Sequence, residues 1–123
     1  IDFNNLNTPQ PIVTSMDSRG SCVSIADTTG NLLFYANTRA ATAGNTTKVY
    51  NRLHQEMPNG SNIAGRGWYK ELVIIPIPDS ANKYYLFTIS ISTIIGFYYS
   101  IIDMSLNNGL GDVTTKNIKI HDV

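Results

Sequence analysis

The sequence predicts an all-β fold made of two consecutive four-stranded antiparallel units, with a β-sandwich as the alternative arrangement of the same strands. Short runs of β-branched and aromatic residues recur along the chain, separated by Gly, Pro, Asn and Asp, as is typical of strands joined by turns. No apolar pattern of helical period extends beyond a turn or two. The two halves also repeat, because Val23 and Val73 stand 50 residues apart in similar apolar runs.

The first unit spans residues 21–58 and follows a stretch, residues 1–16, whose two prolines predict an extended arm or an edge strand. Residues 27–31 supply Asp, Gly and Asn for a turn between its first two strands. Residues 59–70 form a Gly-rich connection to the second unit. The expected strands of the first unit are residues 21–26, 32–37, 48–51 and 56–58.

The second unit, residues 71–120, is the most hydrophobic part of the chain. It begins with a continuous apolar run stopped by Pro76, which is too short for three helical turns and reads as a buried strand. Its last run alternates Lys with Ile, as expected of an outer strand with one wet face. The expected strands are residues 72–75, 84–90, 97–104 and 116–120, in one meandering sheet.

The two units match strand by strand. Residues 22–25 and 32–35 overlay residues 72–75 and 84–87. A period near 50 residues, with four strands in each unit, predicts kelch- or WD-like propeller blades. Propellers close with about four to eight blades, so two blades are expected to be a fragment of a larger propeller.

Composition excludes some functions and leaves others open. The 123 residues contain nine acidic and nine basic side chains, so a nucleic acid would find no excess of positive charge. The longest apolar run falls far short of the roughly 20 residues that cross a bilayer, so the chain is not expected to span a membrane. The single cysteine, Cys22, has no internal disulfide partner and is expected to pack in the core as a small hydrophobe.

The sequence offers no catalytic set. A general base needs a partner within hydrogen-bond reach, and the spacing brings neither His54 nor His121 near Cys22 or a serine nucleophile. Residues 107–112, after Asp103, offer two carboxylates, too few for a calcium loop of the EF-hand kind, and predict a glycine turn. We therefore expect a protein that is not an enzyme and holds no metal or cofactor.

A loop of aromatic and cationic residues is the best candidate for contact with a ligand. Aromatic rings beside cations can stack on sugar faces or receive a peptide. The alternative is that Trp68 is a wedge that seals two packed sheets. The residues concerned are Arg66, Trp68, Tyr69 and Lys70.

Four segments resemble a family of large surface proteins of the Bacteroidetes, whose N-terminal region is described as a kelch- or WD-like propeller. They are SCVSIADTTGNLLFY (residues 21–35), VYNRLHQEMPNG (49–60), ELVIIPIPDSANKYYLFTI (71–89) and YYSIIDMSLNNGLGDVTTKN (98–117). These proteins are exported by the type IX secretion system and are often associated with gliding motility. The chain departs from the family in the longer loop at residues 38–47 and in residues 66–70.

The resemblance implies a non-enzymatic, extracellular or outer-surface module of a Gram-negative bacterium that acts in adhesion, gliding or protein interaction. Its partner would be a protein or a surface glycan. One alternative is a carbohydrate-binding or carbohydrate-active module completed by blades outside this chain. Another is a component or substrate bound to the secretion or motility machinery.

The same resemblance implies two modification sites. Asp27-Thr28-Thr29 and Asp79-Ser80-Ala81 match the triplet at which Bacteroidetes O-glycosylate exported proteins. Both triplets fall in the first predicted hairpin turn of their unit, where a hydroxyl is expected to be exposed. Thr28 and Ser80 are the expected acceptors, although Asp-Thr and Asp-Ser are also ordinary turn formers.

Overall fold

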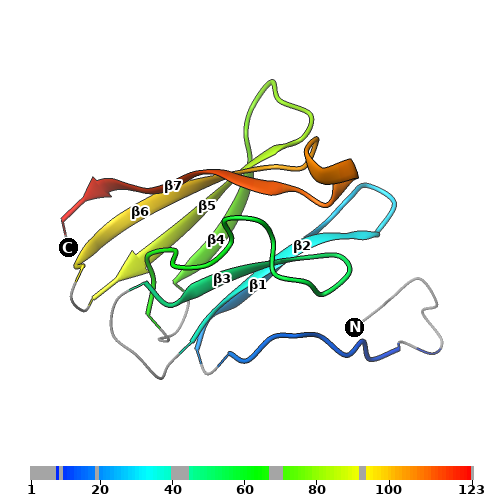
Figure 1. The fold of residues 1–123 in the computed structure, drawn as a ribbon, viewed down its shortest axis with the longest axis horizontal. Helices are drawn as coiled ribbons and strands as arrows, with labels where there is room; N and C mark the ends of the chain where they lie inside the picture. The colour runs from blue at the N-terminus through cyan, green and yellow to red at the C-terminus, as the bar shows by residue number, and fades with distance from the viewer. Residues whose placement is uncertain are drawn as a thin grey trace.

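The computed structural model describes residues 8, 10–18, 20–39, 45–66, 71–91 and 94–122. These residues form two antiparallel sheets, and the described part contains no helix longer than one 3-10 turn (Figure 1). The first sheet has the order β1 (Cys22–Ala26), β2 (Leu32–Thr38), β3 (Thr47–Asn51). The second has the order β4 (Leu72–Pro76), β5 (Lys83–Ser90), β6 (Gly96–Asp103), β7 (Asp112–His121), with η1 (Asn107–Gly109) before β7. The predicted all-β class is confirmed.

The first sheet has three strands, so the prediction of four strands in this unit is wrong. Residues 56–58 do not form a strand: Glu56 makes one isolated antiparallel bridge, to Tyr50. A second isolated bridge joins Ile63 to Thr47. The chain between the two bridges follows the edge of β3 without continuous pairing.

Turns within this segment explain why the ladder breaks. Asn59 and Asn62 both have positive φ angles, 56° each, which reverse the chain where a strand would continue. Gly60 lies so close to the backbone that an added Cβ would stand 2.7 Å from the carbonyl oxygen of Met57. Residues 56–65 are therefore an irregular edge that takes the place of a fourth strand.

The irregular edge is tied to β7 of the other sheet. The side-chain amide of Asn59 donates to the Asp112 carboxylate at 2.9 Å. The Asn117 side chain accepts from the backbone N–H of Ala64 at 2.7 Å and donates to the carbonyl of Asn62 at 3.0 Å. The two sheets are thus held together at this edge by polar contacts as well as by the core.

The second sheet is the four-stranded meander that the sequence predicts, although β7 begins at Asp112, earlier than expected. The glycine turn before it is confirmed: Gly109 and Gly111 have φ angles of 77° and 85°. The Asp103 carboxylate accepts from the hydroxyl (2.6 Å) and the backbone N–H (3.0 Å) of Ser105, and these bonds hold its pKa below the usual range. This turn carries the chain directly from β6 into β7.

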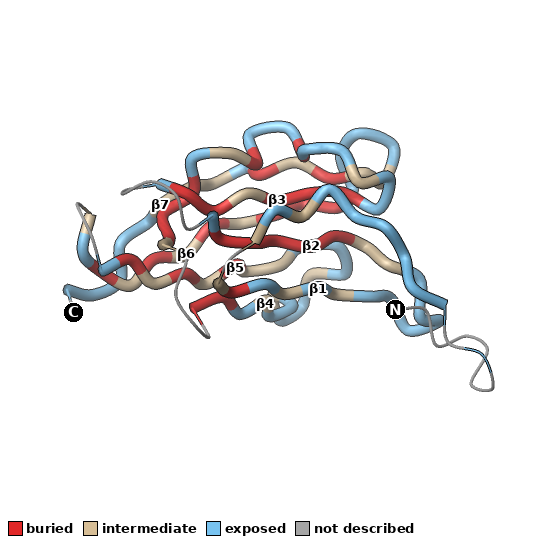
Figure 2. Tube along the Cα trace, turned by 90° about the horizontal axis from the view of Figure 1, so that it is seen from below, coloured by how far each residue is buried: buried red, intermediate tan, exposed pale blue. Residues whose placement is uncertain are grey.

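The two sheets lie face to face and share one core (Figure 2). Both layers, the irregular edge and the β6–β7 turn contribute buried side chains: Phe34, Ala36, Val49, Met57, Ile63, Leu72, Leu86, Ile102, Met104 and Val113. Full burial of one large apolar side chain contributes about 1.5–3 kcal/mol. We call the two sides that meet the inner faces, and the two sides that point away the outer faces.

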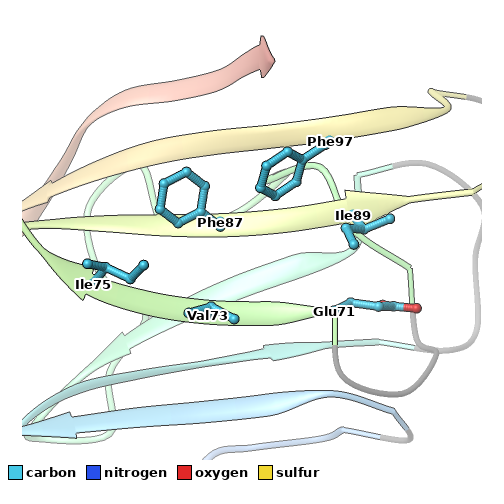
Figure 3. A pocket seen from close by; sticks show the side chains of 6 residues that line it. All are labelled: Glu71, Val73, Ile75, Phe87, Ile89 and Phe97. Carbon is cyan, nitrogen blue, oxygen red and sulfur yellow. The ribbon is translucent and has the colours of Figure 1, made fainter. Parts of the chain in front are cut away.

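The two sheets are stacked with their first strands running in the same direction. The blue β1 and the green β4 run in the same direction (Figure 3), and the two strands are in contact across the sheets. Ser21 and Glu71, which immediately precede these strands, are joined by a bond of 2.7 Å from the Glu71 backbone N–H to the Ser21 hydroxyl oxygen. Corresponding strands have the same direction and the same order in the two sheets. The side of the first sheet that faces the second sheet therefore corresponds to the side of the second sheet that faces away from the first. Val23, accordingly, packs against the core, whereas Val73 points outward and is 49% exposed.

The register corrects the predicted overlay of the second strands. Val23 lies opposite Ala36 in the first hairpin, and Val73 lies opposite Phe87 in the second. Phe87 therefore corresponds to Ala36 and not to Tyr35, as the sequence overlay has it. A bulge at the end of β1 shifts the pairing of the first hairpin, and a shift of one residue moves a side chain to the other face.

Candidate interaction surface

The outer face of the second sheet is apolar across all four strands. The register sets Val73, Phe87, Tyr99 and Ile118 in one row and Ile75, Tyr85 and Ile101 in the next, with Ile89 beside Phe97. Side chains alternate between the two sides of a strand, so these residues share one side. We call this set of nine residues the apolar face.

Aromatic rings form a continuous group on the apolar face. Phe87 stacks on Phe97 with ring centroids 5.5 Å apart, and Tyr85 meets Tyr99 edge to face, also at 5.5 Å. Phe87 also lies 5.5 Å from Tyr85, which joins the two pairs. Such pairs contribute about 0.5–1.5 kcal/mol beyond their burial, so the rings hold one another in place before any partner binds.

Much of the apolar face is open among the described residues. Val73, Ile75 and Ile118 are 49%, 45% and 41% exposed. A shallow groove of about 350 Å³ runs over the face (Figure 3), lined by Glu71, Val73, Ile75, Phe87, Ile89 and Phe97. Glu71 is the one charged side chain in this lining, and it lies at the end of the groove where β4 begins.

This face was not among the sites predicted from the sequence. A signal was present in the run at residues 72–75, in which every position is apolar. Continuous apolar runs are typical of strands that are covered on both sides. In this structure one side of the run meets the first sheet, and no described segment covers the other side.

The outer face of the first sheet is different, because residues 10–18 lie across it. The backbone N–H of Ser15 donates to the Tyr35 hydroxyl at 3.2 Å, and Asp17 accepts from the Asn37 side chain at 3.3 Å. Tyr35 and Asn37 are 1% and 0% exposed. We call residues 10–18 the arm; they form no strand of three or more residues.

Two further contacts fasten the arm. Arg39 Nε lies 2.6 Å from the Asp17 carboxylate, and the Ser15 hydroxyl donates to the carbonyl of His54 at 2.6 Å. Partial burial raises the pKa of Asp17, but hydrogen bonds from Asn37 and Arg39 and the Arg39 charge outweigh it and bring the pKa below the ordinary value. Asp17 is therefore expected to keep its charge to a lower pH than a free aspartate does.

The two histidines, considered from the sequence as candidate general bases, lie in different parts of the structure. His54 Nδ1 lies 3.2 Å from the Tyr35 hydroxyl, where it helps to hold the arm, and His121 is exposed at the end of β7.

The prediction that Cys22 packs in the core is wrong. Cys22 is exposed, because the alternation that turns Val23 inward turns its neighbour outward. The described residues contain no group of three or more metal-binding side chains.

The predicted binding loop is only partly described. Arg66 is half-buried and follows the irregular edge. Trp68, Tyr69 and Lys70 lie outside the described residues, so the expected ligand loop and the alternative of a Trp wedge stay predictions.

The two predicted glycosylation acceptors both lie in hairpin turns. Thr28 is exposed, and Ser80 is half-buried. Beside Thr28, the Asp27 carboxylate accepts from the Thr29 hydroxyl (2.7 Å), the Asn31 backbone N–H (2.9 Å) and the Thr29 backbone N–H (2.9 Å). These hydrogen bonds lower the pKa of Asp27 to about 2. Use of either acceptor stays a prediction.

Comparison of the chain with family models, curated proteins and solved structures gave no match. Within the described residues, no helix is both long and apolar enough to pass through a bilayer.

Proposed function

We propose that this chain is a non-enzymatic interaction module of an exported cell-surface protein, built as two neighbouring blades of a propeller-like stack. In this proposal, the apolar face is the surface at which a further β-sheet packs. The bound partner is a protein, and adhesion, gliding or display is the role that the family resemblance supports.

The observation that carries the proposal is the contrast between two matching surfaces. The inner side of the first sheet corresponds through the repeat to the apolar face, and a neighbouring sheet covers it. Phe34 and Ala36 on that side are 0% exposed, whereas Val73 and Ile75 on the apolar face are 49% and 45% exposed. A contiguous apolar patch of this kind on a folded protein marks an interaction site.

A dye-binding experiment tests whether the apolar face is a binding surface. The purified chain, at low concentration, is expected to bind the apolar dye bis-ANS, and Phe87→Lys is expected to reduce that binding severalfold. Val13→Lys is the matched control, because Val13 is a 90% exposed apolar residue on the arm, away from the face. Equal dye binding by the two variants would contradict the proposal.

The cell-surface part of the proposal needs a separate test. In the source organism, protease added to intact cells is expected to remove the chain, as detected by antibody, while a cytoplasmic marker survives. Digestion only after lysis would contradict surface exposure and leave the packing role of the apolar face to be judged by the dye experiment.

A further inference from the structure

We infer that a second copy of this chain covers the apolar face, with the same face of the partner, to give a two-fold dimer of four stacked sheets. The inference rests on the proposed function, in that the face takes a β-sheet, and adds which sheet it takes.

The other outer face explains why two copies meet in this way. Head-to-tail stacking would require the apolar face of one copy to lie on the outer face of the first sheet of the next. Over β2 that surface is occupied by the arm, through the Ser15–Tyr35 and Asp17–Asn37 bonds. The outward residues of β1 that the arm leaves exposed, Cys22, Ser24 and Ala26, are small, so among the described residues the apolar face is the more extensive open apolar surface of the two. Copies are therefore expected to pair through this face, and the assembly closes at two.

The dimensions of the face suit a dimer. Four strands at ~4.8 Å spacing and the eight residues of β5 at ~3.4 Å each give a face of roughly 19 by 27 Å. Its flat area is therefore about 500 Å², before the relief of the side chains is counted. This is of the same order as the roughly 800 Å² that each partner buries in a stable interface.

The position of Glu71 also permits pairing. Glu71, the charged residue of the groove lining, lies at a corner of the sheet, at the start of edge strand β4. A two-fold axis in the plane of the interface, parallel or perpendicular to the strands, sends that corner to the opposite edge or the opposite end. The two Glu71 carboxylates are then far apart, and the centre of the interface is formed by aromatic rings.

Sedimentation equilibrium over a wide concentration range tests the inference. The wild-type chain is expected to approach twice its 13.6 kDa mass, with bis-ANS binding falling as the dimer forms. Val73→Lys and Phe87→Lys are each expected to weaken dimerisation by more than about tenfold, because each copy would have to bury an unpaired charge. Val13→Lys is expected to dimerise like the wild type. Circular dichroism establishes that each variant is folded, and Val73→Thr replaces Val73→Lys if the lysine variant does not fold.

Each other result has a defined meaning. A wild-type chain that stays at one chain mass throughout, yet binds the dye, overturns the dimer and leaves the proposed function standing. A chain that neither dimerises nor binds the dye overturns both. Open-ended assembly, or a dimer that persists in folded Val73→Lys and Phe87→Lys variants, overturns the like-with-like pairing.

Discussion

The outer faces of the two sheets differ in character, although both sheets are antiparallel meanders and the sequence repeat relates one to the other. On the first sheet, Tyr35 and Asn37 lie beneath the arm and bond to it. On the second, rows of aliphatic and aromatic side chains point outward with no described segment over them. A repeated backbone therefore does not require a repeated surface. The second sheet has the composition of an interior layer, apolar on both sides, and the first has that of an end layer.

The largest expected effect is the loss of stability when a side chain on the inner face of the first sheet is truncated. Phe34→Ala removes a side chain with no exposed area that meets the Tyr84 ring edge to face at 5.4 Å. We expect a loss of about 3–5 kcal/mol in the free energy of unfolding, measured by urea denaturation. Ile75→Ala, on the apolar face, is the matched control, and we expect it to lose less than about 1.5 kcal/mol at protein concentrations where the chain is a monomer. Equal losses would break the contrast between a covered and an open side.

A smaller effect is expected where the arm meets the first sheet. Tyr35→Phe removes the hydroxyl that accepts from the Ser15 backbone N–H and lies against His54. We expect a loss of about 1–2 kcal/mol in stability, together with faster proteolysis of the arm. Tyr85→Phe, whose ring stands on the apolar face, is the control and is expected to leave proteolysis of the arm unchanged. Arm cleavage at the wild-type rate in Tyr35→Phe would show that these bonds do not hold the arm.

A buried hydroxyl on the inner face provides a prediction of opposite sign. Thr88 is 0% exposed, and its hydroxyl has no hydrogen-bond partner among the described residues. Thr88→Val keeps the shape and removes an unpaired polar group, so we expect no change or a gain of up to about 1 kcal/mol. Thr38→Val is the control, because the Thr38 hydroxyl donates to the Ser21 carbonyl at 3.4 Å and accepts from its N–H at 3.2 Å. A clear loss in Thr88→Val would show that this hydroxyl is paired in solution.

The smallest expected effect is the acid dependence of the first hairpin turn. Hydrogen bonds from Thr29 and Asn31 lower the pKa of Asp27 to about 2, against 3.8 for the free side chain. A group whose pKa is lower in the folded state contributes stability above its unfolded pKa and loses it as pH falls through the folded value. We expect this contribution to disappear between about pH 4 and pH 2, as measured by thermal denaturation at a series of pH values.

Two variants isolate this effect. Asp27→Asn should flatten the stability change over that interval, and Thr28→Ala, in the same turn, should leave it as in the wild type. An unchanged acid profile in Asp27→Asn would place the acid dependence elsewhere, for example at Asp17 or Asp103, whose pKa values are also lowered.

Much of the fold follows from local sequence. Apolar runs of strand length, separated by Asp, Asn, Gly and Pro, are sufficient to predict the β4–β7 meander, the first hairpin and the 50-residue repeat. What could not be predicted depends on backbone geometry that the residue pattern does not fix. The turns at Asn59 and Asn62 replace the fourth strand of the first sheet with an irregular edge, and one bulge shifts the register of a hairpin by a residue.

The interaction surface was harder to predict than the strands. Alternation shows that the side chains of Val73 and Phe87 share a side of the sheet, but not whether another layer lies over that side. Burial on one side and exposure on the other follow from the stacking sense of the two sheets, which is a long-range property. The exposed position of Cys22 was missed for the same reason, because it depends on which side of β1 meets the second sheet.

The arm makes the two outer surfaces of the molecule different from each other. Hydrogen bonds and an ion pair fasten the arm over β2 on one outer surface, and no described segment covers the opposite one, so the two outer surfaces would meet a further layer differently. A ring closed by further sheets would have to accommodate the arm beneath its final sheet or displace the arm. The Asp17 and Ser15 contacts therefore make the two outer surfaces of the molecule unequal.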